Sequence, residues 1–261
     1  MKDKVVWITG ASSGIGEALV YAYDNLGAKL IISSRNRDEL FRVKANCTDQ
    51  NQIHILPLNL ENSAELATKT AEAIQAFGKI DILINSGGIS QRSLAMATDL
   101  PTEQRLMNIN FWGTVILSKA VLPHMIKNKS GSIVCISSLV GKFGTRFRSA
   151  YSASKHALHG YFDSLRIEIN HPNIHILLAC PGFIKTNVTI NALTANGEAQ
   201  GTMDSAQENG MLPEIFAQKL IKAIKAKKEE VYIGGKETVG VLLKRLVPRL
   251  FSKIIRKAKV T

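Results

Sequence analysis

The chain has 261 residues, a formal net charge of +12 and a hydrophobic fraction of 45%, which suits one large α/β domain with a full core. Its apolar runs stay below the roughly 18 residues of a membrane span, and strand-like sequence from Lys4 onward leads us to expect no signal peptide. Cys47, Cys135 and Cys180 are scattered, which disfavours a metal site or a disulfide framework, so we expect a reducing, cytoplasmic location.

Strands and helices are expected to alternate along the chain. The predicted strands cover residues 4–9, 28–34, 53–60, 81–86, 131–138, 174–180 and 230–234. The predicted helices cover residues 15–26, 38–45, 63–77 with Asn62 as the cap, 102–127 with a bend at Pro123, and 149–170. This alternation predicts a doubly wound, seven-stranded parallel sheet of the Rossmann type with helices on both faces. The polar segment 187–209 breaks the rhythm, and we expect it to form a mobile flap.

A glycine-rich segment, TGASSGIG, joins the first strand to the first helix. Gly10, Gly14 and Gly16 allow a tight turn and let backbone N–H groups approach a pyrophosphate, beside the positive end of the helix dipole. The spacing differs from the common dinucleotide fingerprint, and a plain turn is the alternative. The strand before the segment and the helix after it favour a nucleotide-binding loop.

The residues after the second strand bear on the choice of cofactor. Positions 33–37 hold no carboxylate for a ribose 2′-hydroxyl, and instead carry Arg35 and Arg37. Guanidinium groups are good partners for a 2′-phosphate. The sequence therefore predicts NADP(H) over NAD(H), with two solvated arginines at the start of a helix as the alternative.

Tyr151 and Lys155 lie four residues apart on a predicted helix and share a face. An ammonium about 4 Å from the phenol, at an effective dielectric of about 20, would stabilise the phenolate by roughly 4 kcal/mol. That energy corresponds to about three pKa units and would bring the phenol near neutrality. Ser138 follows the fifth strand at the ligand-binding edge of the sheet. Such a pair is common by chance, but together with Ser138 and the glycine turn it favours an acid–base site.

With the motifs NINFWG and PGFIKT added, the chain resembles the short-chain dehydrogenase/reductase family from about residue 4 to about residue 235. The resemblance implies that Tyr151 is the general acid/base and that Lys155 lowers its pKa and binds the nicotinamide ribose. It also implies that Ser138 orients the carbonyl and that Asn110 supports a proton-relay water. The implied catalytic residues are Asn110, Ser138, Tyr151 and Lys155, and no metal site is predicted.

Two departures from the family pattern concern the cofactor. The usual Asn-Asn-Ala-Gly is replaced by Asn-Ser-Gly-Gly at 85–88, and the usual aspartate after the third strand is Asn59. Both changes leave a cofactor contact plausible, because Asn85 is kept and an asparagine still offers an acceptor. The predicted cofactor contacts are Gly10, Ser12, Ser13, Gly14, Ile15, Gly16, Arg35, Arg37, Asn59, Leu60, Asn85, Gly87, Tyr151, Lys155, Pro181, Gly182, Ile184 and Thr186.

The expected function is hydride transfer between nicotinamide and an alcohol or ketone, in a homodimer or homotetramer. A non-catalytic dinucleotide-binding scaffold of the same fold is the alternative. Loops 90–96, 139–148 and 187–209 are expected to form the substrate pocket, so the substrate itself stays open. Arg146 and Arg148 would suit an acidic substrate, although solvated loop charges are the simpler interpretation.

The last segment, 239–261, is predicted as an amphipathic tail attached to a dinucleotide-binding domain of residues 1–238. Seven basic and no acidic residues lie in it, which account for more than half of the net charge of +12. Apolar residues recur at helical spacing, and Pro248 is expected to break or restart the helix. A terminal helix docked on protein and a helix on a membrane surface are both open, and a lipophilic substrate is inferred by analogy only. Nucleic acid binding has no support beyond charge.

Overall fold

Seven parallel strands form one sheet, in the order β3-β2-β1-β4-β5-β6-β7, in the computed structural model, which describes residues 1–169 and 171–258. The strands are β1 (Val5–Thr9), β2 (Lys29–Ser33), β3 (Ile53–Ile55), β4 (Ile82–Asn85), β5 (Gly131–Ile136), β6 (Ile174–Pro181) and β7 (Glu230–Ile233). Thr9 pairs with both Ser33 and Asn85, so the carboxyl ends of three strands meet at one edge. The strand order reverses between β1 and β4, where ligands bind in such sheets. The predicted doubly wound fold is confirmed.

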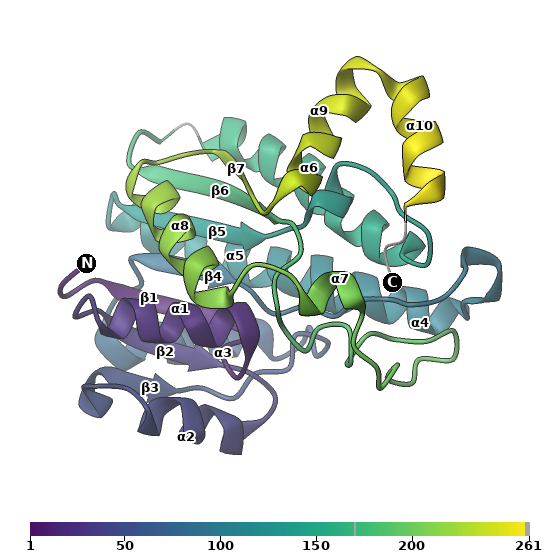
Figure 1. Cartoon of the computed structure of the whole chain (residues 1–261). Coiled ribbons are helices and arrows are strands. Elements are labelled where there is room, and N and C mark those ends of the chain that lie inside the picture. The colour runs from purple at the N-terminus through teal and green to yellow at the C-terminus, as the bar shows by residue number, and fades with distance from the viewer. Residues whose placement is uncertain (170, 259–261) are drawn as a thin grey trace.

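Helices cover both faces of the sheet (Figure 1). They are α1 (Gly14–Asp24), α2 (Arg37–Ala45), α3 (Leu66–Phe77), α4 (Leu100–Met107), α5 (Gly113–Lys127), α6 (Ser149–Ile169), α7 (Ser205–Glu208), α8 (Pro213–Lys225), α9 (Val239–Leu246) and α10 (Pro248–Lys257). Apolar side chains of α1, α2 and α8 share one core cluster, and those of α3, α5 and α6 share another. The two clusters lie on opposite faces of the sheet.

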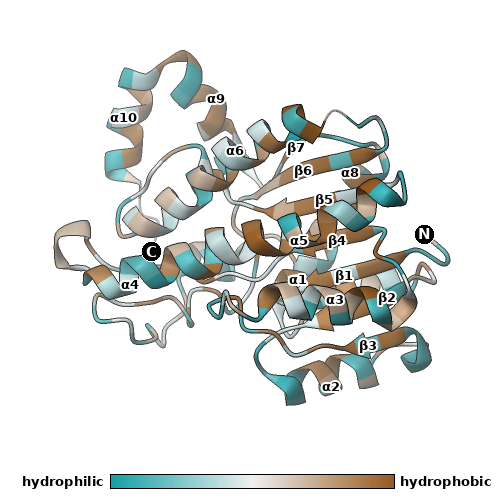
Figure 2. Ribbon diagram, turned by 180° about the vertical axis from the view of Figure 1, so that it is seen from behind, coloured by the Kyte–Doolittle hydropathy of each residue, from teal (hydrophilic) through white to brown (hydrophobic). Residues whose placement is uncertain are grey.

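Strand β1 contributes side chains to both core clusters. Val6 and Ile8 belong to the cluster under α1, whereas Val5 and Trp7 belong to the cluster under α5, since successive side chains of a strand point to opposite faces. All five residues of β1 are buried. Figure 2 shows the same hydrophobic colour along the central strands. A strand covered on both faces has no polar alternation, which is the pattern expected of a parallel sheet.

Three elements differ most from the sequence-based expectation. Strand β3 is limited to Ile53–Ile55, although the N–H groups of Leu56 and Leu58 still donate to the Ile32 and Ser34 carbonyls of the neighbouring segment at 3.0 Å. Helix α3 begins at Leu66 after a turn, so Asn62 is not its cap. The expected helix over 102–127 is divided into α4 and α5 by a π-helical turn at Asn108–Trp112, while Pro123 stays inside α5. Residue 170, at the expected end of α6, lies outside the described residues.

The C-terminal segment forms a hairpin of two helices, α9 and α10, that projects away from the sheet (Figure 1). Pro248 stands at the first position of α10, where a missing N–H costs nothing. Of the two expected outcomes at Pro248, a break or a restart of the helix, the structure shows a restart. Among the helices of the described residues, none combines the length and the apolarity that spanning a bilayer requires.

Candidate active site

A cavity of about 1390 Å³ opens at the carboxyl edge of the sheet, over the point where the strand order reverses. Its floor is the turn after β1, and its walls are the segments that follow β2, β4, β5 and β6. Most of the predicted site residues line it. Arg37, Asn85 and Asn110 do not, and each is described below.

The turn after β1 has the backbone geometry of a phosphate cradle. Gly10 and Gly14 have φ values of +66° and +55°, which side chains rarely adopt. A Cβ on Gly16 would stand 2.1 Å from the carbonyl oxygen of Gly10, so only glycine permits this close turn. Ser12, Ser13, Ile15 and the three glycines all line the cavity. Because α1 begins at Gly14, its free N–H groups point at the same space, and a pyrophosphate fits there.

The end of β2 presents one of the two predicted arginines to the cavity. Arg35 is exposed and lines the cavity, and it takes part in no ion pair among the described residues. Arg37 lies outside the wall, with its guanidinium 5.4 Å from the Phe41 ring centroid. Arg42, which the sequence did not single out, donates to the Ser12 carbonyl at 3.1 Å. Its charge is neutralised by Glu17 at 2.8 Å, so it braces the loop.

The segments after β3 and β4 supply the next part of the wall. Asn59, Leu60 and Gly87 line the cavity. Asn85 is buried behind it and donates through Nδ2 to the Ser118 hydroxyl at 3.1 Å. The structure therefore gives Asn85 a place in the core rather than in the cavity wall.

The segment after β6 closes the opposite wall. Pro181, Gly182, Ile184 and Thr186 all line the cavity, as the resemblance implied. Thr186 packs closely on the glycine turn, since a Cβ on Gly14 would lie 2.9 Å from its Cγ2 atom. This contact places the segment directly above the phosphate cradle.

Glu237 holds the same segment from the root of the α9–α10 hairpin. Its Oε1 atom accepts from the backbone N–H of Phe183 at 3.1 Å and from that of Gly235 at 2.9 Å. The wall above the cradle is thus tied to the chain segment that leads into the hairpin.

Tyr151, Ser138 and Lys155 meet in the cavity at the start of α6. The Lys155 ammonium lies 5.8 Å from the centroid of the Tyr151 ring and donates to the Ile136 carbonyl at 2.8 Å. The Ser138 hydroxyl accepts from the N–H of Val140 at 3.3 Å, which turns it toward the start of the following 3₁₀ turn. The structure therefore brings the three predicted side chains together at one end of the cradle.

The electrostatics of Tyr151 differ from the expectation that Lys155 dominates them. Burial raises the pKa of Tyr151, and hydrogen bonding from Ser138 and the positive charges of Arg148 and Arg92 lower it in part, leaving it above the ordinary value. Burial also lowers the pKa of Lys155 to about 8. The net shift of the Tyr151 pKa is therefore upward rather than downward, because burial outweighs the influences that lower it. The Lys155 ammonium, which was expected to lower this pKa, donates its hydrogen bond to the Ile136 carbonyl.

Asn110 lies in the π-helical turn and is fully buried. Its amide forms a two-way pairing with the backbone of Ile89, accepting from N–H at 2.8 Å and donating to C=O at 2.9 Å. The second Nδ2 hydrogen goes to Ser154 at 3.1 Å. The side chain thus fixes the wall that follows β4 and ties it to α6, and it does so from behind the cavity.

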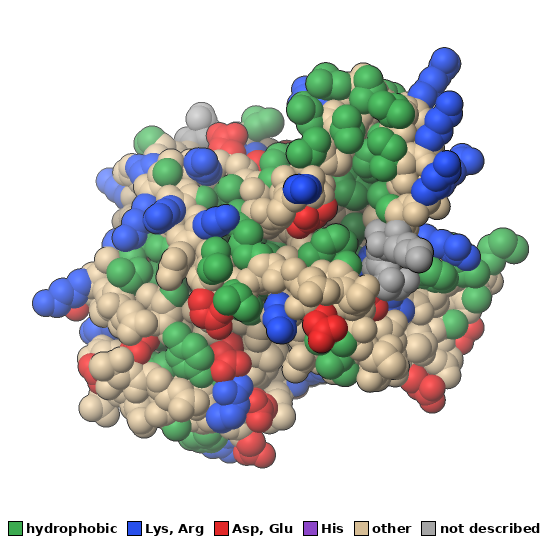
Figure 3. Space-filling model, in the orientation of Figure 1, with side chains coloured by type: hydrophobic (Ala, Val, Ile, Leu, Met, Phe, Trp, Pro, Cys, Tyr) green, Lys and Arg blue, Asp and Glu red, His purple; other side chains and the backbone are tan. Residues whose placement is uncertain are grey.

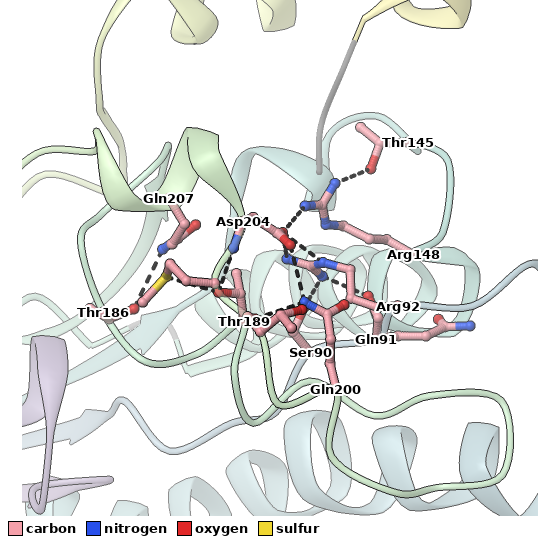
Figure 4. A network of polar contacts seen from close by, with 12 residues as sticks. Ser90, Gln91, Arg92, Thr145, Arg148, Thr186, Thr189, Gln200, Asp204 and Gln207 are labelled. Carbon is pink, nitrogen blue, oxygen red and sulfur yellow. Dashed lines mark hydrogen bonds and ion pairs between the residues drawn. The ribbon is translucent and has the colours of Figure 1, made fainter.

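A buried ionic network forms the far wall of the cavity, where the substrate loops meet (Figure 4). Asp204 accepts from Arg92 at 2.6 Å and from Arg148 at 3.3 Å, with all three side chains no more than 7% exposed. Arg148 also donates to Thr145 at 3.3 Å, and Gln200 donates to Asp204 at 3.2 Å. The network anchors the segment 187–209, which was expected to be a flap, to two other loops.

The comparisons with known proteins agree with this geometry. A family model described as short chain dehydrogenase matches residues 4–197. The chain belongs to the short-chain dehydrogenase/reductase family. It is 40% identical to a "Dehydrogenase/reductase SDR family protein 7-like" of Anopheles gambiae over 98% of this chain and 83% of that one. It is also 38% identical to the mouse "Dehydrogenase/reductase SDR family member 7B" over 98% of this chain and 81% of that one.

Solved structures of the short-chain dehydrogenase/reductase family share the fold. A short-chain dehydrogenase from Streptomyces avermitilis superposes with a TM-score of 0.81 at 25% identity, over 98% of each chain. A family member from Burkholderia phymatum, in complex with NAD, gives 0.84 at 22% identity over 95% of each chain. Family membership makes the chain an oxidoreductase that uses a nicotinamide dinucleotide.

Several residues of this short-chain dehydrogenase/reductase site were not predicted from the sequence. Gln91 accepts from the N–H of Tyr151 at 3.2 Å and so satisfies a free donor at the start of α6. His159 contacts the Ser137 hydroxyl at 3.0 Å and Glu230 at 3.2 Å, behind the cavity wall that follows β5. Although burial opposes it, hydrogen bonds from His159, Lys142 and Tyr232 lower the pKa of Glu230 to about 2. These partners are far apart in the chain, so no local spacing signals them.

Proposed function

We propose that the chain is an NADP(H)-dependent reductase and dehydrogenase that transfers a hydride between nicotinamide and a lipophilic ketone or alcohol. One observation supports this most directly: the Tyr151 phenol and the Ser138 hydroxyl line the same cavity as the glycine cradle. An acid–base group beside a dinucleotide site is what carbonyl reduction requires. The residues present therefore fit both the cofactor and the reaction.

In reduction, the Tyr151 hydroxyl donates its proton to the carbonyl oxygen of the substrate while Ser138 hydrogen-bonds the same oxygen. A bound nicotinamide supplies the hydride for the carbonyl carbon in this direction and accepts it in the reverse one. Because burial raises the pKa of Tyr151, the phenol is protonated at neutral pH and ready to donate. Oxidation needs the phenolate, so we expect it to gain rate as the pH rises.

Lys155 and the arginines have different roles in this proposal. Lys155 lines the cavity with N–H donors beyond the one that it gives to Ile136, and these can bind a ribose hydroxyl. Arg148 and Arg92 lower the pKa of Tyr151 and so stabilise the phenolate that remains after proton transfer. The negative charge of the Tyr151 phenolate is therefore stabilised by Arg148 and Arg92, which lie on the substrate side of the cavity.

The preference for NADP(H) follows from the end of β2. Arg35 lines the cavity where the adenine ribose would lie, and the stretch 33–37 carries no carboxylate that could accept from a ribose 2′-hydroxyl. A guanidinium there would pair with a 2′-phosphate. A structure from Thermococcus sibiricus, complexed with 5-hydroxy-NADP, shares the fold with a TM-score of 0.77 at 20% identity, over 90% of this chain and 97% of that one.

The preference for a lipophilic substrate follows from the apolar part of the cavity wall. Leu139, Val140 and Phe143 line the cavity on one side, and Phe251 and Ile255 of α10 line it on another. An apolar wall gains free energy by excluding water from an apolar substrate. We therefore propose a substrate with one carbonyl group and a sizeable hydrocarbon part.

The test is Tyr151→Phe, assayed by NADPH oxidation with a panel of ketones and by NADPH fluorescence titration. We expect turnover to fall at least about 1000-fold, because the proton donor is removed, while the NADPH Kd stays within about twofold of wild type. Near-normal turnover in the variant would refute the role of Tyr151. An inactive wild type that still binds NADPH would favour the non-catalytic scaffold.

A further inference from the structure

The α9–α10 hairpin has an inner face that belongs to the cavity. Leu243, Phe251 and Ile255 line the cavity from this hairpin. The ring of Phe251 packs edge-to-face on Phe143, with centroids 5.1 Å apart, in a small cluster with Leu139 that is separate from the two main cores. The hairpin therefore covers the substrate end of the cavity and rests on it through a few apolar contacts.

The outer face of the same hairpin is apolar and exposed. Leu242, Leu246 and Leu250 are 57%, 66% and 51% exposed, and Val247 between the two helices is 42% exposed. Figure 3 shows apolar side chains gathered over α9 and α10, in the part that projects from the body of the protein. Large apolar side chains from two helices thus form one projecting ridge. A contiguous exposed apolar patch of this kind is typical of a surface that binds a partner or a membrane.

Basic side chains flank this ridge. The exposed cations of the hairpin are Lys244, Arg245, Arg249, Lys253, Arg256 and Lys257. The sequence from 239 to 257 contains no acidic residue. Figure 3 shows the lysines and arginines along the outer edge of the ridge. An apolar ridge with a wholly cationic rim is complementary to the surface of an anionic bilayer, where hydrocarbon lies below negative headgroups.

We propose that the α9–α10 hairpin docks on anionic membranes, with Leu242, Leu246, Val247 and Leu250 inserted at the headgroup boundary. The docked hairpin would then open the cavity toward the bilayer, since its other face lines the substrate end. This second statement rests on the proposed function, because it takes the substrate to be a lipophilic carbonyl compound dissolved in the membrane. The docking itself depends only on the ridge and its rim.

Other occupants fit the ridge less well. A second copy of the chain would bring two cationic rims together, and like charges at that distance repel. A nucleic acid would match the rim but would leave the central leucines against a polar backbone. An anionic bilayer satisfies both the charge and the apolar centre.

The first experiment measures binding of the full chain to vesicles by flotation, with 70:30 phosphatidylcholine:phosphatidylserine and with pure phosphatidylcholine. We expect binding to the anionic vesicles at least about 10-fold tighter than to the neutral ones. The double variant Leu246→Ser with Leu250→Ser should lose at least about 10-fold of that binding. The matched control is Ile167→Ser, because Ile167 is apolar and 80% exposed on α6, outside the hairpin, and its binding should equal that of wild type.

Unchanged binding in the double variant, equal loss in the Ile167→Ser control, or no preference for anionic vesicles would overturn the proposal. Thermal unfolding verifies that each variant is folded. Sedimentation velocity without vesicles tests the rival occupant: a dimer that dissociates in the double variant would assign the ridge to a second copy and also overturn it. None of these measurements depends on turnover, so an inactive enzyme would leave the docking result intact.

The second experiment tests the path to the cavity. With a ketone that partitions into vesicles, kcat/KM should rise on addition of anionic vesicles for wild type but not for the double variant. A water-soluble ketone should show equal rates for both proteins, since neither Leu246 nor Leu250 lines the cavity. Equal effects of vesicles on the two ketones would refute the proposed path from the bilayer to the cavity. The docking itself would still be decided by the flotation experiment.

Discussion

The cavity has two halves that are built in different ways. The cofactor half is formed mainly by the backbone. It consists of a tight turn, in which Gly16 has no room for a side chain, at the edge of the sheet where three strands end side by side. The substrate half is made of side chains that come from distant segments, with Asp204 between Arg92 and Arg148. The first half depends on short-range geometry and can be recognised in a sequence motif. The second depends on pairing between loops, and its stability should respond to single charges.

The largest expected effect is that of Asp204→Asn, which should destabilise the substrate half and leave the cofactor half unchanged. Removal of this charge leaves two guanidiniums in a buried site, so we expect a loss of about 3–5 kcal/mol in the free energy of unfolding. At low temperature the NADPH Kd should stay close to that of wild type. Chemical denaturation gives the first value and fluorescence titration the second.

The control for this variant is Asp163→Asn, which removes an exposed ion pair with Arg166. Exposed pairs contribute less than about 1 kcal/mol, so its effect should be small. Equal losses in the two variants would mean that the network does not hold the substrate half together.

The cofactor half of the cavity is tested by Gly16→Ala. The added Cβ would stand 2.1 Å from the Gly10 carbonyl and must force the turn open. We expect the NADPH Kd to rise about 100-fold, or about 2.7 kcal/mol, as measured by titration. Gly160→Ala is the matched control, because it is inside α6 with open space around its Cβ position. It should stabilise the protein by about 0.5–1 kcal/mol and leave the Kd unchanged.

Arg35→Gln sharpens the comparison within the cofactor half. If Arg35 binds a 2′-phosphate, the KM for NADPH should rise about 10- to 100-fold while the KM for NADH stays constant, since a charge-assisted hydrogen bond is lost. Steady-state kinetics with both cofactors measures this. Arg37→Gln should change neither value by more than about twofold, because Arg37 packs on Phe41 outside the cavity. A wild type that prefers NADH would contradict the assignment.

The smallest expected effect is a displacement of the pH profile in Ser138→Ala. Ser138 stabilises the phenolate of Tyr151, so its removal raises that pKa further. Oxidation requires the phenolate, and its rate increases as the pH rises through the pKa. The ascending limb of the pH profile of kcat/KM for oxidation should therefore move to higher pH. Ser138→Thr keeps a hydroxyl and should leave the limb in place, whereas equal profiles for the alanine and wild-type enzymes would exclude this role.

The sequence was sufficient for the sheet and for the glycine turn, because both follow from local patterns. The motif TGASSGIG contains the glycines whose positive φ angles the turn needs, and the apolar strands indicate a sheet covered on both faces. The tetrad positions were placed by spacing and resemblance. The structure brings Ser138, Tyr151 and Lys155 to one cavity, while Asn110 stays behind its wall.

The rest could not be predicted because it depends on contacts between segments far apart in the chain. Lys155 lies near the Tyr151 ring as expected, but its ammonium also donates a hydrogen bond to the Ile136 carbonyl, which no helical spacing can reveal. Asp204 is one polar residue among many in its segment, and only the fold brings it to Arg92. The sequence showed the helical periodicity of the tail, but it could not show that one side of these helices lines the cavity.

The bond pattern of Glu237 has a practical consequence for shortening the chain. This carboxylate serves the amides of Phe183 and Gly235, and the absent side chain of Gly182 leaves the space that it fills. A protein cut before this position would lose an acceptor for two N–H groups and leave a void next to β6. A protein cut after Thr238 would lack the two terminal helices and still keep that wall, so residue 238 marks where the hairpin can be removed with least damage.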